Sequence, residues 1–174
     1  MDVSILYQPF LSRLPPRAHI LDLGCGSGRD TKAFLDLGFR VTAIDASQEM
    51  AIRANQLTGQ QVQVQEFNHI NEPSTYDGVW ACASLLHVNL IELPLIMAKI
   101  RDSLKSGGIL YVSFKYGNRE RTANGRYFTD LNQQRLQELV DLVPAFQVAK
   151  IWMTDDLRPG RDQKWLNSIL YKDS

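Results

Sequence analysis

The stretch ILDLGCGSGRD, residues 20–30, constrains the fold more than any other part of the chain. An apolar run leads directly into three glycines at alternate positions, Gly24, Gly26 and Gly28. Glycine adopts backbone conformations that other residues avoid, and it lets a ligand approach the main chain closely. A glycine-rich turn after a strand is typical of domains that bind a nucleotide or a nucleotide-like cofactor. The sequence therefore predicts an α/β domain with a cofactor site at this turn.

Strand and helix patterns alternate along most of the chain. Strands are expected at residues 19–24, 40–45, 61–67, 76–84 and 108–114, and two further strand-like runs at 146–154 and 164–172. Helices are expected at residues 30–38, 48–57, 91–105 and 131–143, with Ser47 and Asp130 as N-terminal caps of the second and the fourth. Such alternation predicts a parallel sheet with helices on both faces and ligands at the carboxyl ends of the strands. The short connection between the last two runs predicts an antiparallel pair.

Composition excludes several classes of protein. A chain of 174 residues with 44% hydrophobic residues is expected to form one globular domain. Its net charge is zero and its pI is about 6.8, which disfavours a large nucleic acid as partner. Two cysteines are too few for a disulfide scaffold or a zinc site, so no metal is expected. There is no signal-peptide pattern and no apolar run long enough to cross a membrane, so we expect a cytoplasmic protein.

The spacing of the glycines separates two cofactors. The dinucleotide fingerprint is G-x-G-x-x-G, and here Arg29 occupies the position of the third glycine. Asp22 would also bring a carboxylate close to the phosphates of a dinucleotide, which disfavours a nicotinamide oxidoreductase. S-adenosylmethionine has no phosphate, and its ammonium suits an acceptor near the strand end. Asp45, at the end of the second expected strand, would accept hydrogen bonds from both ribose hydroxyls.

Four segments together resemble the class I S-adenosylmethionine-dependent methyltransferases. LDLGCGSG is similar to the first motif of that family, and VTAIDAS to its ribose-binding strand end. YDGVWACASLLHV resembles the fourth-strand motif, and LKSGGILYVSF the turn into the fifth strand. The resemblance implies a Rossmann-like, seven-stranded, mostly parallel sheet with a C-terminal antiparallel hairpin. It implies one methyltransferase domain over residues 1–174, in which 1–18 form an N-terminal lid segment and 19–174 the core.

The resemblance also implies a set of contacts to S-adenosylmethionine and its product S-adenosylhomocysteine. Asp22 would hold the ammonium, Asp45 the ribose, and Ala46 or Met50 would pack on adenine. Glu66 would accept from the adenine amino group and Phe67 would donate its backbone N–H, with Asn68 as an alternative polar partner. The full set of expected cofactor contacts is Asp22, Gly24, Cys25, Gly26, Gly28, Asp45, Ala46, Met50, Glu66, Phe67, Ala81 and Ser84.

The methyl acceptor is less constrained by the sequence. His87 follows the fourth strand and is a candidate general base, with a structural histidine as the alternative. The basic segment 115–128 is expected to be a loop that closes over an anionic substrate, with a solvated loop as the alternative. Its candidate substrate contacts are Lys115, Arg119, Arg126 and Tyr127, and Arg158 and Arg161 form a second candidate loop.

These observations predict methyl transfer to an O, N or S atom of a small molecule, which the basic segment allows to be anionic. The alternatives are a tRNA-modifying methyltransferase and a non-catalytic S-adenosylmethionine-binding module. The sequence does not predict the acceptor itself or the oligomeric state.

Overall fold

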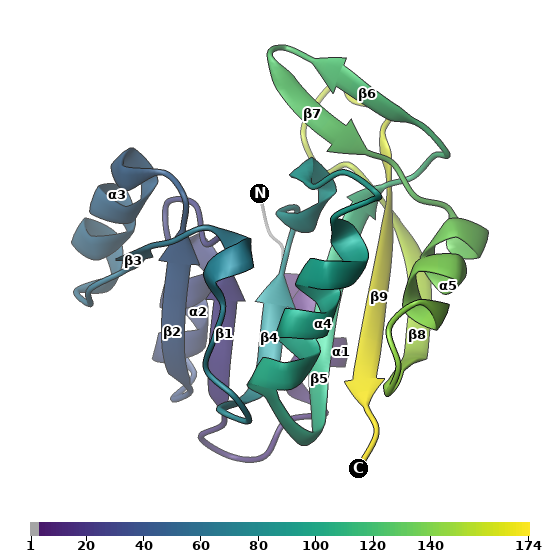
Figure 1. Cartoon of the computed structure of the whole chain (residues 1–174). Coiled ribbons are helices and arrows are strands. Elements are labelled where there is room, and N and C mark those ends of the chain that lie inside the picture. The colour runs from purple at the N-terminus through teal and green to yellow at the C-terminus, as the bar shows by residue number, and fades with distance from the viewer. Residues whose placement is uncertain (1–3) are drawn as a thin grey trace.

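The computed structural model describes residues 4–174, and its main feature is a seven-stranded sheet. The strands are β1 (His19–Leu23), β2 (Arg40–Asp45), β3 (Gln63–Val64), β4 (Tyr76–Ala81), β5 (Leu104–Lys115), β8 (Phe146–Asp155) and β9 (Lys164–Lys172). Their order across the sheet is β3-β2-β1-β4-β5-β9-β8 (Figure 1). The pairs from β3 to β5 are parallel, whereas β9 is antiparallel to both of its neighbours. The expected mostly parallel sheet with a C-terminal antiparallel hairpin is confirmed.

Helices cover both faces of the sheet (Figure 1). They are α1 (Ser4–Leu11), α2 (Arg29–Asp36), α3 (Gln48–Thr58), α4 (Leu93–Ser103) and α5 (Gln133–Asp141), with 3-10 turns η1 (Phe67–His69) and η2 (Leu85–His87). On one face, Phe10 of α1 and Phe34 of α2 pack against Trp80 and Tyr111 of the sheet. On the other face, α4 and α5 bury their aliphatic side chains in a second core, with α4 next to β5 and α5 next to β8. No helix in the described part of the chain is long and apolar enough to cross a membrane.

Local signals placed most helix ends correctly. The Ser47 hydroxyl accepts a hydrogen bond from the Met50 backbone N–H at 3.3 Å, so Ser47 caps α3 as expected. Asp130 does not cap α5, because its carboxylate binds Arg121 at 2.8 Å. Asn132 caps the helix instead and accepts from the backbone N–H of Arg135 at 2.9 Å. The strand expected at 61–67 shrinks to two paired residues because the chain turns into η1.

The segment 115–128 was expected to be a loop, and most of it is a β-hairpin. The strands β6 (Glu120–Ala123) and β7 (Arg126–Thr129) pair antiparallel around Asn124 and Gly125. These two turn residues have φ values of 51° and 73°, and positive values at both positions define a type I′ turn. The hydroxyl of Thr129 donates to the carbonyl of Val88 at 2.6 Å and ties the hairpin to the chain after η2. The hairpin stands above the carboxyl ends of the strands (Figure 1).

Candidate active site

The glycine-rich turn lies between β1 and α2 and packs tightly against the end of β4. A methyl carbon built on Gly24 would lie 2.6 Å from the Cβ atom of Ser84, so no larger residue fits there. A methyl carbon built on Gly26 would meet no protein atom within 4 Å, although the φ of 56° favours glycine. Gly28, the N-cap of α2, faces Ala54 of α3. The turn therefore presents open backbone at Gly26 and is fixed by packing on both sides.

Asp45 ends β2 beside this turn and orients it. Its Oδ2 atom accepts from the backbone N–H of Gly26 at 2.8 Å, and its Oδ1 atom accepts from the backbone N–H of Ser47 at 2.8 Å. A carboxylate has about four lone-pair sites, so each oxygen keeps one for a further donor. The side chain is partly buried rather than enclosed. Asp45 thus anchors the turn and the α3 cap while retaining the capacity to bind two hydroxyls.

Asp22, near the end of β1, is almost fully buried, with 2% of its surface exposed. Its Oδ2 atom accepts from the Thr31 hydroxyl at 2.5 Å. Burial, followed by the negative charge of nearby Asp30, raises the pKa of Asp22 to about 7. A cation bound next to Asp22 would favour its charged form. Asp22 therefore suits an ammonium partner and is expensive to leave charged without one.

Ser84 supplies a second unsatisfied group at the same place. Its Oγ atom is the one buried side-chain nitrogen or oxygen in the described residues that has no hydrogen-bond partner. It lies 3.4 Å from where a Gly24 methyl carbon would stand, and the Phe67 ring lies at the same distance. Buried polar groups normally have partners, and an orphan at a functional site calls for an unseen one. The arrangement fits a polar ligand over the glycine-rich turn.

The other expected cofactor residues surround this point at different depths. Ala81 is fully buried, so neither its side chain nor its backbone is exposed to a ligand in this structure. Ala46 and Glu66 are exposed, and Met50 and Cys25 are partly buried. Phe67 begins η1, where the first N–H groups have no partner within the turn. Acceptors, free donors and open backbone together fit S-adenosylmethionine: carboxylates for ammonium and ribose, and backbone for the rest.

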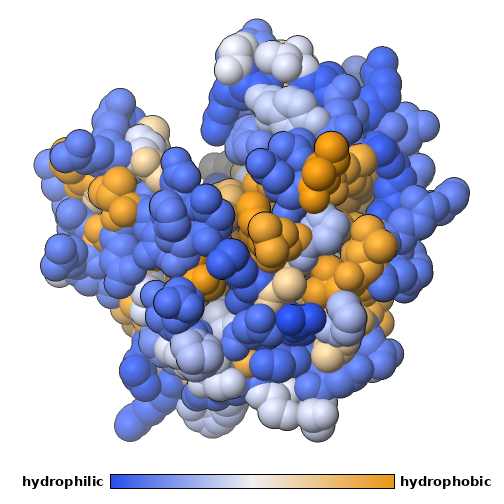
Figure 2. Space-filling view, in the orientation of Figure 1, coloured by the Kyte–Doolittle hydropathy of each residue, from blue (hydrophilic) through white to orange (hydrophobic). Residues whose placement is uncertain are grey.

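A cavity of about 680 Å³ adjoins the glycine-rich turn. Its floor is one face of the sheet end, where Tyr111, Ser113 and Lys115 alternate along β5. Asn167 and Trp165 of β9 pair with Ser113 and Lys115 in the ladder and continue this floor. Its other walls come from α1, the residues after β4, the β6–β7 hairpin and the loop between β8 and β9. In the space-filling view the surface is notched between α3 and this hairpin (Figure 2).

His87 lines the cavity and has a defined tautomer. Its Nδ1 atom lies 2.8 Å from the backbone carbonyl oxygen of Tyr127. A carbonyl oxygen can only accept, so Nδ1 carries the hydrogen and Nε2 keeps a lone pair. Burial lowers the pKa of His87, the hydrogen bond to the Tyr127 carbonyl raises it, and the positive charges of Arg126 and Lys115 lower it further, so that the net shift is downward. At neutral pH the ring is therefore a proton acceptor.

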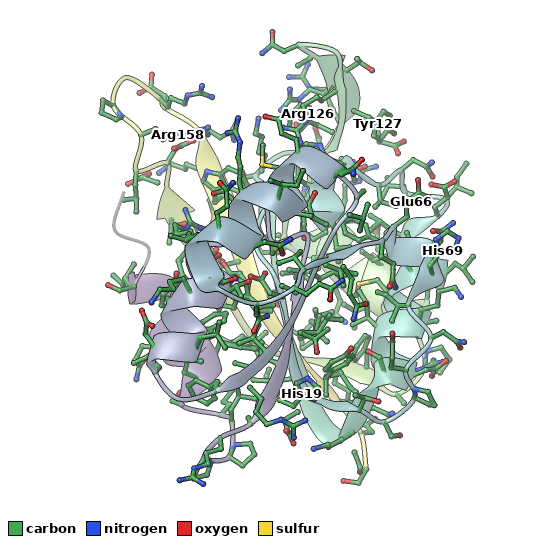
Figure 3. All side chains as sticks on the ribbon, turned by 90° about the vertical axis from the view of Figure 1, so that its left-hand side faces the viewer. His19, Glu66, His69, Arg126, Tyr127 and Arg158 are labelled. Carbon is green, nitrogen blue, oxygen red and sulfur yellow. The ribbon has the colours of Figure 1, made fainter. Side chains whose placement is uncertain are left out.

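The candidate substrate residues divide into two groups. Lys115 and Arg126 line the cavity, together with Arg158 and Arg161 of the β8–β9 loop. Arg126 and Arg158 lie at the end of the molecule opposite to His19 (Figure 3). Arg119 and Tyr127 do not line the cavity, and the Tyr127 hydroxyl binds Glu120 instead.

Most cavity residues were not found from the sequence, among them Phe128, Trp165 and Ser113. Ser113 could have been found, because it lies two residues before Lys115 on the expected fifth strand and so shares its face. Its hydroxyl accepts from the backbone N–H of Ala83 at 2.7 Å and holds that residue at a φ of 51°. Trp165 depends on the β5–β9 register, which has no local signal in the sequence. Phe128 depends on the β6–β7 hairpin, whose signal is the Asn124-Gly125 turn.

The N-terminal helix α1 contributes Ile5 and Leu6 to the cavity wall. It is held by the Tyr7 hydroxyl, which donates to Asp30 at 2.6 Å. Residues 1–3 of the expected lid segment lie outside the described residues. The role of this segment as a lid stays a prediction.

Comparison with known families identifies the domain. The family model described as "Methyltransferase domain" matches residues 21–112. A ubiquinone biosynthesis O-methyltransferase of Xanthomonas campestris pv. campestris is 33% identical over 108 residues, which are 56% of this chain and 43% of that protein. A 2-methyl-6-phytyl-1,4-hydroquinone methyltransferase of Synechocystis sp. is 31% identical over 109 residues, 59% of this chain and 34% of that protein. The chain thus spans less than half the length of these curated relatives.

Solved structures agree over almost the whole chain. The 1,6-didemethyltoxoflavin-N1-methyltransferase of Burkholderia thailandensis, with bound 1,6-didemethyltoxoflavin and S-adenosylhomocysteine, superimposes with a TM-score of 0.82 at 24% identity. The match covers 98% of this chain and 76% of that one. A SAM-dependent methyltransferase of Methanosarcina mazei gives a TM-score of 0.82 at 18% identity and covers 99% of both chains. At such identities these likenesses establish the fold.

Proposed function

Because the chain belongs to the methyltransferase-domain family of class I S-adenosylmethionine-dependent proteins, we propose that it transfers a methyl group from this cofactor to a small-molecule acceptor. The observation that carries the proposal is the shared boundary of two sites at the end of β4. Ser84 packs on the glycine-rich turn, and Ala83, its neighbour, lines the 680 Å³ cavity. A cofactor over the turn and an acceptor in the cavity would therefore meet at this point.

The curated relatives support a small acceptor. Those proteins are named for ubiquinone biosynthesis and for 2-methyl-6-phytyl-1,4-hydroquinone, and each name refers to a quinone or hydroquinone rather than to a macromolecule. The cavity has the size of a typical small-molecule site, which ranges over about 300–1,000 Å³. Its walls combine aromatic and charged side chains. We include O, N and S atoms as acceptors, since the shape does not separate them.

The protein's contribution to the reaction is binding, alignment and exclusion of water. S-adenosylmethionine, when bound, supplies both the methyl group and the sulfonium leaving group. Asp45 would accept the ribose hydroxyls, and Asp22 and Ser84 would receive the polar atoms of the amino-acid end. Ser113 fixes the backbone of Ala83 at the boundary between the two sites. Alignment of an acceptor in a closed pocket supplies on the order of 7–11 kcal/mol of the barrier lowering.

His87 is the proposed proton acceptor for an acidic acceptor group. Its Nε2 atom has no hydrogen-bond partner among the described residues, and the ring lies in the cavity wall. The carbonyl of Tyr127 holds the ring in the tautomer that leaves Nε2 free. Such general-base help contributes typically 10²–10⁴-fold to a rate. Acceptors that lose no proton before transfer would not need it.

The test is a calorimetric titration of the full chain with S-adenosylmethionine, S-adenosylhomocysteine and NAD. We expect micromolar binding of the two adenosyl compounds and none of NAD. Asp45→Ala should weaken the binding of S-adenosylhomocysteine by about 1.5–3 kcal/mol, the usual value of hydrogen bonds to a charged group. Glu49→Gln, which removes an exposed acid from the first turn of α3, is the matched control and should change nothing.

Two outcomes would contradict the proposal. If a folded sample binds neither adenosyl compound, the cofactor assignment is wrong. If Asp45→Ala binds S-adenosylhomocysteine with unchanged affinity, Asp45 does not bind the ribose. Binding without turnover across a screen of small phenols, amines and thiols would instead favour a non-catalytic binding module.

A further inference from the structure

The cavity carries an excess of positive charge that the protein does not neutralise. Five cationic side chains line it: Arg29, Lys115, Arg126, Arg158 and Arg161. Arg29 is paired with Asp30, and Arg158 with Asp156. The remaining cavity carboxylate, Asp155, faces Lys164 at 2.8 Å. Within residues 4–174, Lys115, Arg126 and Arg161 have no carboxylate within ion-pair distance.

Lys115 is the centre of this charge. It is partly buried at the end of β5, and its ammonium lies 4.0 Å from the centroid of the Phe128 ring. Burial lowers the pKa of Lys115, and the charges of Arg121, Arg158 and Arg161 lower it further, more than nearby Asp130 raises it. The cationic groups of β5 and of the β8–β9 loop therefore repel one another across this end of the cavity. A bound anion would relieve that repulsion.

Aromatic surface adjoins the charge. Trp165 is the ladder partner of Lys115, Phe128 lies beneath the Lys115 ammonium, and both aromatic residues line the cavity. Leu86 and Leu157 add aliphatic wall. Aromatic and aliphatic walls with a few convergent polar groups are typical of sites for flat organic molecules.

The floor of the cavity places the charge away from the cofactor turn. Ser113 binds Ala83 at the boundary of the two sites, and Lys115 follows two residues later on the same face of β5. A strand rises about 3.3 Å per residue, so the Cα atom of Lys115 lies roughly 7 Å beyond that of Ser113. One substituted ring spans such a distance.

We propose that the acceptor is an aromatic anion whose ring packs against the aromatic and aliphatic wall of the cavity and whose carboxylate, sulfonate or phosphate is held by Lys115 and Arg161. This assignment rests on the proposed function, because it names the substrate class of the same cavity. The anionic group occupies the outer end of the cavity, and the atom to be methylated lies at the Ala83 end. Arg126, which acts on His87, stands on the hairpin side.

A matched pair of dyes tests the charge without any knowledge of the acceptor. 8-Anilinonaphthalene-1-sulfonate and N-phenyl-1-naphthylamine differ only by one sulfonate, and both report binding by fluorescence. Titrations are run with the full chain, with and without saturating S-adenosylhomocysteine, so that binding in the cofactor site is separated from binding in the cavity. We expect the sulfonate to bind at least tenfold tighter than the neutral dye when S-adenosylhomocysteine is present.

Single substitutions then locate the anion. Lys115→Met and Arg161→Met should each lower the affinity for the sulfonate dye about tenfold or more. The affinity for the neutral dye should change by no more than about twofold. Lys115→Arg keeps the charge and should retain most of the affinity. Arg40→Met removes the same charge from an exposed position at the start of β2 and should have no effect.

Three results would contradict the proposed anion subsite. They are equal affinity for the two dyes, no binding of the sulfonate dye, and an equal loss of affinity for the sulfonate dye in Arg40→Met and Lys115→Met. Failure of the proposed function is measured separately. If the samples bind the sulfonate as expected but do not bind S-adenosylhomocysteine in the calorimeter, the cofactor assignment falls and the anion subsite stands.

Discussion

At the scale of single residues, the ring of His87 shows how a few neighbours set a chemical property. The Tyr127 carbonyl fixes the hydrogen on Nδ1, and burial with two nearby cations disfavours a second proton on Nε2. Arg126, one of the two cations that lower this pKa, directly precedes Tyr127 in the sequence. Both the tautomer and the charge state thus depend on β7.

This dependence predicts the effect of Arg126→Met. Removal of a positive charge favours the protonated ring, so the pKa of His87 should rise toward its ordinary value of 6.5. Nitrogen-15 NMR of the ring measures both the pKa and the tautomer. Arg40→Met is the control for the loss of one positive charge far from the ring. If His87 has the same pKa in Arg126→Met and in the parent protein, Arg126 of the hairpin does not influence the ring, and the prediction is wrong.

Residue roles were predictable where a strand end fixes the position. Asp45 and Gly26 follow directly from the ends of β2 and β1, and the structure joins them by a 2.8 Å hydrogen bond. Ser84 was predicted as a cofactor contact, but the burial of its unpartnered hydroxyl against Gly24 could not be predicted from the sequence. That contact joins residues 60 positions apart through tertiary packing alone. The cofactor roles of these residues stay predictions.

At the scale of elements, the β6–β7 hairpin explains why the basic segment was misjudged. The sequence contains Asn124-Gly125, the strongest short-range hairpin signal, between two runs that can pair. In a hairpin, side chains alternate between faces, so Arg126 and Phe128 reach the cavity whereas Tyr127 points to Glu120. A loop has no such period, and for that reason Tyr127 was placed with the substrate residues. The residues that line the cavity follow from the period, not from the charge of the segment.

The same turn predicts a local change of stability. Gly125→Ala places a side chain in the left-handed region, which costs about 1–2 kcal/mol. We expect faster amide exchange over residues 120–129, weaker binding of the aromatic sulfonate and unchanged affinity for S-adenosylhomocysteine. Hydrogen exchange by mass spectrometry measures the first effect. Gly38→Ala, at a φ of 89° after α2, carries the same conformational cost elsewhere, and equal exchange in the hairpins of the two variants would refute the expectation.

At the scale of the whole molecule, strand–helix alternation was sufficient for the sheet but not for its buried charges. Alternation predicts the parallel pairing within β1 to β5, and the short connection between β8 and β9 predicts their antiparallel pairing. The alternation says nothing of Asp22 and Asp30, two acids buried on one face of the sheet. Asp30 is satisfied by Tyr7, Trp80 and Arg29. Asp22 has one donor side chain, Thr31, and a pKa raised to about 7.

This raised pKa predicts a pH dependence of global stability. An Asp in the unfolded chain titrates near pH 3.9, so between about pH 4 and 7 the folded protein binds a proton that the unfolded chain has released. The free energy of unfolding should therefore fall as the pH rises through this window. The side chain of Asp22→Asn does not titrate, so the stability of this variant relative to the parent protein should grow from pH 5 to pH 8. Urea unfolding at several pH values measures the difference, and Asp36→Asn, an exposed acid at the end of α2, should show no such trend.

Cofactor binding should weaken this pH dependence of stability in the parent protein. If Asp22 receives the ammonium of S-adenosylhomocysteine, the charged carboxylate gains a partner, and the loss of stability between pH 5 and 8 should shrink when the compound is saturating. The variant Asp22→Asn would bind the compound more weakly at pH 8 than the parent protein does, but with less dependence on pH. A parent protein whose stability falls equally with and without the compound would place the ammonium elsewhere. In that case the role of Asp22 would be structural, as a buried acid that binds Thr31 and stabilises the turn.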